Sequence, residues 1–259
     1  MSRGMGFIPD SLADQFAARE QRPVVGVGSH ALLSGTGSIA TSRDWRHLLD
    51  RVSDQGPTNS CVGQFVSSAV YLAGQAQNAP VLRPSALWSY AVARLRDHYG
   101  QLVDLGCRPS QMMLGCEENG LVAESRWPFE VDAVNVAPPF DADIAGADAL
   151  LTGWYSADMM DIPAALRLAL DKGHFPGLAM EVHEDFGNVN GFDVYDEPRG
   201  DLVGSHMVTL VGYRPGAFLL LNSWGRTWAD EGCCWVSERF VASHYCKQRV
   251  VVTAAPASQ

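Results

Sequence analysis

The chain has 259 residues, a size that suits one large domain or two lobes that share a cleft. Hydrophobic residues make up 47% of the sequence and charged residues 19%, which is ordinary for a globular protein with a substantial core. The net charge is −10 and no basic run is present. We therefore expect no nucleic acid partner and no attraction to anionic lipid.

Signals for export or membrane insertion are missing from the sequence. The stretch MSRGMGFIPDSLADQF contains no apolar core of a signal peptide. No window approaches the roughly 18 apolar residues of a membrane span. We expect a soluble, cytoplasmic protein with no membrane partner, although export by another route or packaging into a virion stays open.

The six cysteines are sparse for so long a chain, which favours free thiols over a disulfide framework. Cys107 and Cys116 are close enough in sequence for a local bridge to remain an alternative. The sequence contains no Cys-x-x-Cys pair and no His/Cys spacing typical of zinc. It therefore predicts neither a metal nor another cofactor.

Residues 1–43 show little regular pattern and are predicted to form an N-terminal extension. A short helix is expected within it, over SLADQFAARE at residues 11–20. The globular body is predicted to occupy residues 44–259. The division places all the candidate chemistry described below in one domain.

The first clear element of that body is a buried helix that begins after Ser60. Apolar residues recur with a helical period from Cys61 to Leu72, and Ser60 is the predicted N-cap. Cys61 then lies in the first turn, where unpaired N–H groups and the helix dipole favour a thiolate. Further helices are predicted over residues 85–99, 110–119 and 163–172.

Later segments have strand character. Short apolar runs bounded by Gly, Pro or Asp occur at residues 178–182, 207–211, 218–221 and 234–236. Helices first and strands later predict an α+β protein, with a helical lobe packed against a sheet lobe.

Two further residues complete a candidate constellation with Cys61. His206 lies where a loop becomes an apolar strand, and Asn222 follows the next strand. A side-chain amide there can accept a hydrogen bond from one imidazole nitrogen and aim the other at sulfur. Each residue alone also has an ordinary structural explanation: a core cysteine, a satisfied strand-edge histidine and a turn asparagine.

Taken together, these residues and their flanking motifs resemble the papain-like cysteine peptidase family over most of the chain. His206 lies 145 residues after Cys61 and Asn222 lies 161 after it, near the spacing of about 130–150 residues typical of that family. The motifs that carry the resemblance are residues 44–46, 54–56 with 60–61, 119–129, 204–213 and 222–232. The sequence departs from the family signature at Thr58, where a disulfide cysteine is usual, and at Val62, where an aromatic residue is usual.

The resemblance implies a two-lobe fold with the catalytic cleft between a helical lobe and an antiparallel sheet or barrel lobe. It implies that Cys61, His206 and Asn222 form a triad that cleaves peptide bonds through a thioester acyl-enzyme. In this scheme Gln55 and the Cys61 backbone N–H hold the oxyanion. Further roles against substrate are implied for Trp224, Trp228, Gly106 and Ser205.

The segment from Gly6 to Asp10 resembles the short N-terminal segment of bacterial family members, and a bacterial or phage source is expected. The resemblance implies an arm that lies along the cleft and inhibits the enzyme. The alternative is a disordered or packing tail. The expected partner is a peptide or protein substrate. Two rival functions stay open: a catalytically silent binding protein, and a thiol acyltransferase or isopeptidase on the same fold.

Overall fold

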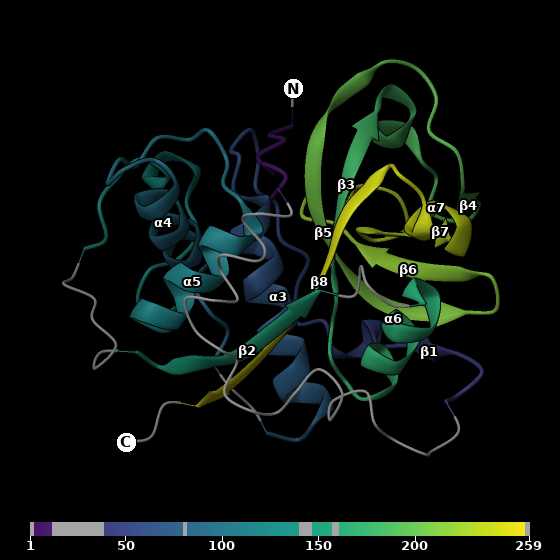
Figure 1. The fold of residues 1–259 in the computed structure, drawn as a ribbon, viewed down its shortest axis with the longest axis horizontal. Helices are drawn as coiled ribbons and strands as arrows, with labels where there is room; N and C mark the ends of the chain where they lie inside the picture. The colour runs from purple at the N-terminus through teal and green to yellow at the C-terminus, as the bar shows by residue number, and fades with distance from the viewer. Residues whose placement is uncertain (1–2, 12–38, 80–81, 140–146, 157–160, 257–259) are drawn as a thin grey trace.

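The computed structural model describes residues 3–11, 39–79, 82–139, 147–156 and 161–256. Figure 1 shows three helices, α3, α4 and α5, gathered on one side and most of the strands on the other. The N-terminal segment lies between these two parts. The α+β prediction is confirmed, with helices first and strands later along the chain. The helix expected over residues 11–20 falls almost wholly outside the described residues.

The helical lobe packs closely because small residues line the helix contacts. A Cβ at Gly63 would lie 2.4 Å from the backbone oxygen of Ala86, and a Cβ at Gly115 would lie 2.9 Å from that of Val92. Most of α3 is buried, including its polar residues Gln64 and Ser67. The three helices are α3 (Cys61–Ala76), α4 (Ala86–Asp97) and α5 (Pro109–Asn119).

The predicted cap of the nucleophile helix is only partly realised. Ser60 occupies the N-cap position of α3, but its side chain makes no cap hydrogen bond. Its hydroxyl instead lies 2.8 Å from that of Thr58. The predicted N-cap position of Ser60 is thus confirmed, while its side chain bonds to a neighbouring hydroxyl. By contrast, Ser85 caps α4 and accepts from the Trp88 N–H at 3.1 Å.

The sheet lobe is built on one eight-stranded sheet in the order β2-β8-β3-β5-β6-β7-β4, with β1 paired to β5. Every pairing is antiparallel except the short β4–β7 contact. The strands are β1 (Arg43–Asp44), β2 (Ala149–Ser156), β3 (Gly177–His183), β4 (Val194–Tyr195), β5 (Leu202–Arg214), β6 (Ala217–Leu221), β7 (Cys233–Ser237) and β8 (Cys246–Pro256). In the described residues the other helices are α6 (Ile162–Asp171), α7 (Glu238–Ala242), η1 (Arg46–Leu48), η2 (Val131–Ala133) and η4 (Glu184–Asn188).

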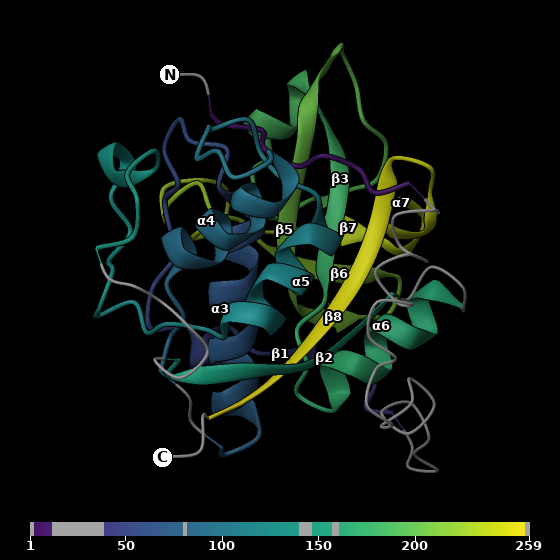
Figure 2. The ribbon, with the colours of Figure 1, turned by 60° about the vertical axis from the view of Figure 1, so that its left-hand side comes forward.

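The longest strand that the sequence pattern missed is β8. Polar residues interrupt its apolar run, and two of them, Gln248 and Arg249, are nevertheless buried. Arg249 is satisfied by donating to the backbone oxygen of Val241 at 2.9 Å. Figure 2 shows the N-terminal segment crossing the top of the molecule toward the upper end of β8, where Gln248 contacts it.

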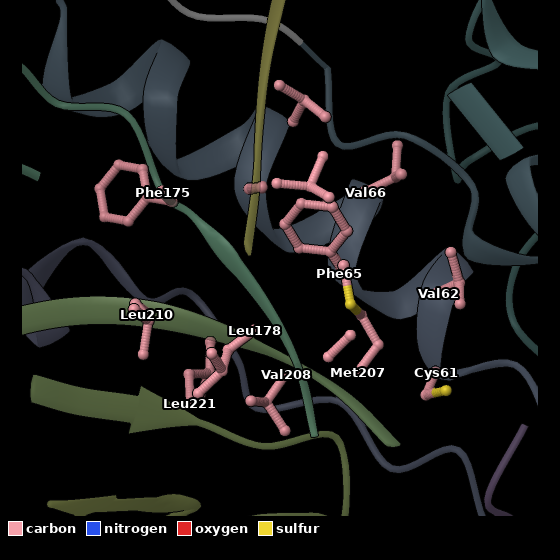
Figure 3. Packing of buried hydrophobic residues seen from close by; sticks show 14 of the residues in the cluster. Cys61, Val62, Phe65, Val66, Phe175, Leu178, Met207, Val208, Leu210 and Leu221 are labelled. Carbon is pink, nitrogen blue, oxygen red and sulfur yellow. The ribbon is translucent and has the colours of Figure 1, made fainter. Parts of the chain in front are cut away.

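A continuous apolar core joins the two lobes. Figure 3 shows Cys61 at the beginning of α3, Phe65 one turn further along, and Met207 on the neighbouring strand β5. Gly177 keeps this contact tight, since a Cβ there would lie 2.5 Å from Met207 and 2.7 Å from Phe65. Within the described ranges, no helix is both long and apolar enough to cross a bilayer.

Candidate active site

His206 and Asn222 are joined by a buried hydrogen bond between their side chains. His206 lies within β5, and Asn222 follows β6, the strand paired with it. The His206 Nε2 to Asn222 Oδ1 distance is 2.8 Å. Asn222 Oδ1 also accepts the Ser223 N–H at 2.8 Å, so this atom is an acceptor and the histidine proton lies on Nε2. The other ring nitrogen, Nδ1, is left without a hydrogen-bond partner.

Cys61 lies beside the residue that follows His206. The backbone N–H of Met207 acts on the Cys61 sulfur and lowers the pKa of that thiol. The nucleophile candidate at the start of α3 therefore contacts strand β5 at the residue next to His206.

Burial controls the charge of this pair. It raises the pKa of the Cys61 thiol to about 11, an effect that the N–H groups of Met207, Gly6 and Val62 oppose only in part. Burial also lowers the pKa of His206 to about 4, against the effect of the Asn222 hydrogen bond. Burial therefore disfavours the charged form of each group while the site is covered.

Gln55 bonds through its side-chain amide to the residue that follows Asn222. Its Oε1 accepts from the Ser223 hydroxyl at 2.6 Å, which fixes the amide orientation. Its Nε2 donates to the Thr58 carbonyl at 2.7 Å and to the Gly4 carbonyl at 3.2 Å. The amide thus presents an N–H to a carbonyl oxygen, which is the task expected of an oxyanion donor.

The two predicted tryptophans belong to one aromatic cluster. Trp224 stacks on the His206 ring, with centroids 5.0 Å apart and planes 25° from parallel. Trp228 meets Trp224 edge-on at 5.6 Å and lies 5.3 Å from Phe186. Trp224 therefore covers the histidine directly, whereas Trp228 packs against Trp224.

Residues 3–10, here called the arm, pass through the space between the lobes. The Phe7 N–H donates to the Ser205 carbonyl at 3.3 Å on the sheet side. On the helical side, Cys107 donates to the Gly6 carbonyl at 3.0 Å and accepts from the Ile8 N–H at 3.2 Å. The arm thus forms one strand-like bridge to the sheet lobe and one to the helical lobe, and both bridges are parallel.

Three glycines allow the arm to come this close. A Cβ at Gly4 would lie 1.8 Å from the Thr58 carbonyl oxygen, and one at Gly6 would lie 1.9 Å from that of Asn59. On the segment that faces the arm, Gly106 has φ +82°, and a Cβ there would lie 1.9 Å from the Gly6 oxygen. The predicted Gly106 and Ser205 positions therefore both face the arm.

Polar side chains anchor the arm at both ends. Arg3 pairs with Asp54 and donates to the Trp224 carbonyl at 3.0 Å. At the other end, Asp10 accepts from the Ser110 N–H at 2.9 Å and from Gln248 Nε2 at 2.9 Å. These contacts connect the arm to the sheet lobe and the helical lobe alike.

Sequence reasoning missed a support beneath the arm. Asn59 Oδ1 accepts the Met5 N–H at 3.0 Å, while Asp104 accepts the Asn59 N–H at 3.0 Å. Tyr90 donates to the same carboxylate at 2.7 Å. Cys107 contacts the arm through its backbone N–H and carbonyl groups, whereas the sequence pointed only to its thiol. The glycine at position 106, which follows Asp104 and Leu105, was the local sequence signal for this segment.

The cysteine thiols and the possible metal ligands were both considered in the sequence. All six cysteines are free and buried, so the alternative Cys107–Cys116 bridge is not formed. Burial raises the pKa of Cys116 to about 12. In the described part of the chain, no cluster of three or more His, Cys, Asp or Glu residues is arranged to hold a metal ion.

The helical lobe packed against an antiparallel sheet lobe is the papain-like fold. Comparison with solved structures agrees. Xylellain, a cysteine protease from Xylella fastidiosa, superposes with a TM-score of 0.75 at 19% identity, covering 97% of this chain and 96% of that one. Digestive procathepsin L 3 of Tenebrio molitor larval midgut gives a TM-score of 0.68 at 21% identity, covering 87% and 72%.

A third solved structure is a Carica candamarcensis cysteine protease in complex with E-64, with a TM-score of 0.63 at 21% identity over 83% of this chain and 99% of that one. Among curated proteins, a cathepsin L-like peptidase of Aedes aegypti is 27% identical over 210 residues, 75% of this chain. The match spans only 58% of that relative's length. No family model matches the chain.

Proposed function

We propose that the chain is a cysteine endopeptidase in which Cys61, His206 and Asn222 act as a triad and residues 3–10 hold the site closed. The observation that carries the proposal is the His206–Asn222 hydrogen bond of 2.8 Å, which leaves Nδ1 without a hydrogen-bond partner. A histidine fixed in this tautomer can take the thiol proton and later return it. The peptidase domain is taken as residues 44–259 and the N-terminal extension as residues 1–43.

The first step follows once the arm leaves. Water and substrate then reach the cleft, so the burial that keeps Cys61 and His206 neutral is relieved. His206 Nδ1 accepts the thiol proton, and the sulfur attacks the carbonyl carbon of the substrate peptide bond. Asn222 stabilises the resulting imidazolium through the Nε2 proton, and Trp224 shields that bond from water.

The tetrahedral oxyanion receives two hydrogen bonds. One comes from Gln55 Nε2, which already donates to the Gly4 carbonyl. The second comes from the Cys61 backbone N–H, one of the unpaired donors in the first turn of α3. His206 then protonates the leaving amine, and water releases the acyl group from the sulfur.

The direction of the arm explains why it blocks the site without being a substrate. The peptide bond over the nucleophile presents the Gly6 N–H to the Cys61 sulfur, where that donor lowers the pKa of the thiol. A nucleophile needs a carbonyl carbon at this point. The parallel bridges of the arm to Ser205 and Cys107 hold it in this unreactive direction.

The experiment is proteolysis of a mixed peptide library by the intact chain and by the Gly6→Ala chain, with a Cys61→Ser partner for each. The proposal predicts new peptides with free carboxyl ends from the Gly6→Ala protein and none from either serine variant. Products joined to an added amine would instead indicate acyl transfer. Turnover that survives Cys61→Ser would contradict the assignment of the nucleophile.

A further inference from the structure

The socket that holds Asp10 is a preformed carboxylate site at the far end of the cleft. It is made by Ser110 on α5 and Gln248 on β8, whose side chains are only 1% and 3% exposed. The Ser110 N–H and hydroxyl each donate to one carboxylate oxygen of Asp10. Gln248 Nε2 donates to the same carboxylate at 2.9 Å, and its Oε1 faces the Asp10 N–H at 3.4 Å.

These groups suit an anion for a physical reason. Ser110 lies in the first turn of α5, where backbone N–H groups have no partner within the helix and the dipole favours negative charge. No side chain of α5 itself caps that end. Asp97 of α4 also reaches it, but Asp97 accepts from the Arg108 N–H and is paired with the Arg108 guanidinium at 2.6 Å. The Asp10 carboxylate is therefore the capping group at Ser110.

The arm fixes the distance from this socket to the nucleophile. Gly6 lies over the Cys61 sulfur, and Asp10 follows it by four residues. The amide that joins Gly6 and Phe7 donates to Ser205 and accepts from Cys107. A substrate that runs in the opposite, reactive direction can bond one of its own amides to the same two partners. Each substrate residue then lies beside the same part of the cleft as the corresponding arm residue.

We propose that this socket binds an acidic side chain of the substrate, four residues before the residue whose carbonyl is attacked. The inference rests on the proposed function and names its substrate class. When the arm leaves, Ser110 and Gln248 lose the carboxylate that satisfies their buried polar groups. A substrate aspartate or glutamate restores those hydrogen bonds, whereas a neutral side chain restores them only in part.

The test uses the full chain with Gly6→Ala, which displaces the arm, and two fluorogenic peptides. Both carry Phe just before the residue whose carbonyl is attacked, and they differ only in Asp or Asn three positions before that Phe. We expect kcat/KM for the Asp peptide to be higher by about tenfold, carried mainly by KM, because charge-assisted hydrogen bonds are lost with Asn. Adding Ser110→Ala and Gln248→Leu should remove the preference, while Gln111→Leu on the same helix should leave it unchanged.

The outcomes separate this inference from the function beneath it. Equal kcat/KM for the two peptides, or a preference that survives the socket substitutions, overturns the inference and leaves the peptidase proposal standing. If neither peptide is cleaved, the same pair is measured by fluorescence anisotropy on the Gly6→Ala, Cys61→Ala chain. Tighter binding of the Asp peptide then supports the socket, and equal binding overturns it, whatever becomes of the triad.

Discussion

The side-chain amide nitrogen of Gln55 lies 3.2 Å from the backbone carbonyl oxygen of Gly4. The donor that we assign to the reaction oxyanion is therefore occupied by the arm. Occupation of the cleft and catalysis compete for the same N–H group. If this assignment holds, we expect the position of the arm to set the activity of the intact chain.

Gly6→Ala should raise peptidase activity by about tenfold or more. A tenfold rise corresponds to a loss of about 1.4 kcal/mol in the binding of the arm. The added Cβ would lie 1.9 Å from the Asn59 carbonyl oxygen, so the arm cannot keep its path. Hydrolysis of a fluorogenic peptide measures the effect. Gly187→Ala is the matched control, because nothing lies within 4 Å of the Cβ added there. Equal activity of the two variants would contradict the role given to the arm.

Gln55→Ala should lower kcat by about 10²–10³-fold when measured in the Gly6→Ala background, as expected for loss of one oxyanion donor. Ser223→Ala should have a smaller effect in the same direction, because the serine hydroxyl only holds Gln55 Oε1 in place at 2.6 Å. Steady-state kinetics would separate kcat from KM. A Gln55→Ala chain that retains its kcat would remove this residue from the reaction.

Asn222→Ala should reduce kcat by roughly tenfold to a hundredfold, with KM little changed, because the residue positions His206 and does not contact substrate. The stacked Trp224 ring will hold the imidazole only in part. Nitrogen chemical shifts of the His206 ring provide the second readout, since loss of the Oδ1 acceptor should mix the two tautomers. An unchanged tautomer together with unchanged kcat would show that Asn222 has no positioning role.

The pH at which Cys61 becomes reactive should differ between the closed and the opened chain. Burial raises its pKa to about 11 in the closed state, so alkylation by iodoacetamide should be slow at neutral pH and rise as pH approaches that value. With Gly6→Ala the thiol meets water and an imidazole that can take its proton, so the rise should move to lower pH. Peptide mass spectrometry of Cys61 follows both rates. Identical profiles would mean that the arm does not control the thiol.

The nucleophile helix and the histidine strand could be predicted because their signals are local. The apolar period after Cys61 marks a buried helix, and the apolar run after His206 marks a buried strand. That strand begins at Leu202, so His206 lies inside it and not where a loop becomes a strand. Their meeting was predicted only through family resemblance, since no local pattern states that α3 and β5 touch. Asn222 was identified through the same resemblance, and its place after a strand agreed with it.

The arm socket and strand β8 could not be predicted, because buried polar contacts have no periodicity. Gln248 interrupts an apolar run and looks like a surface residue until Asp10 is placed against it. Asn59 and Asp104 likewise appear as loop residues, yet their hydrogen bonds form the wall beside Gly6. Such pairs join segments that are far apart in the chain, and only tertiary structure brings their partners together.

Intact-protein and peptide mass spectrometry after treatment with a peptide epoxide tests the central claim most directly. The account predicts one adduct per Gly6→Ala chain, located on Cys61, with much slower labelling of the unaltered chain and of Gly6→Ala, His206→Ala. The other five cysteines are buried and should stay unmodified. A folded Gly6→Ala chain that takes up no epoxide at Cys61, or takes it up equally well without His206, would contradict the account.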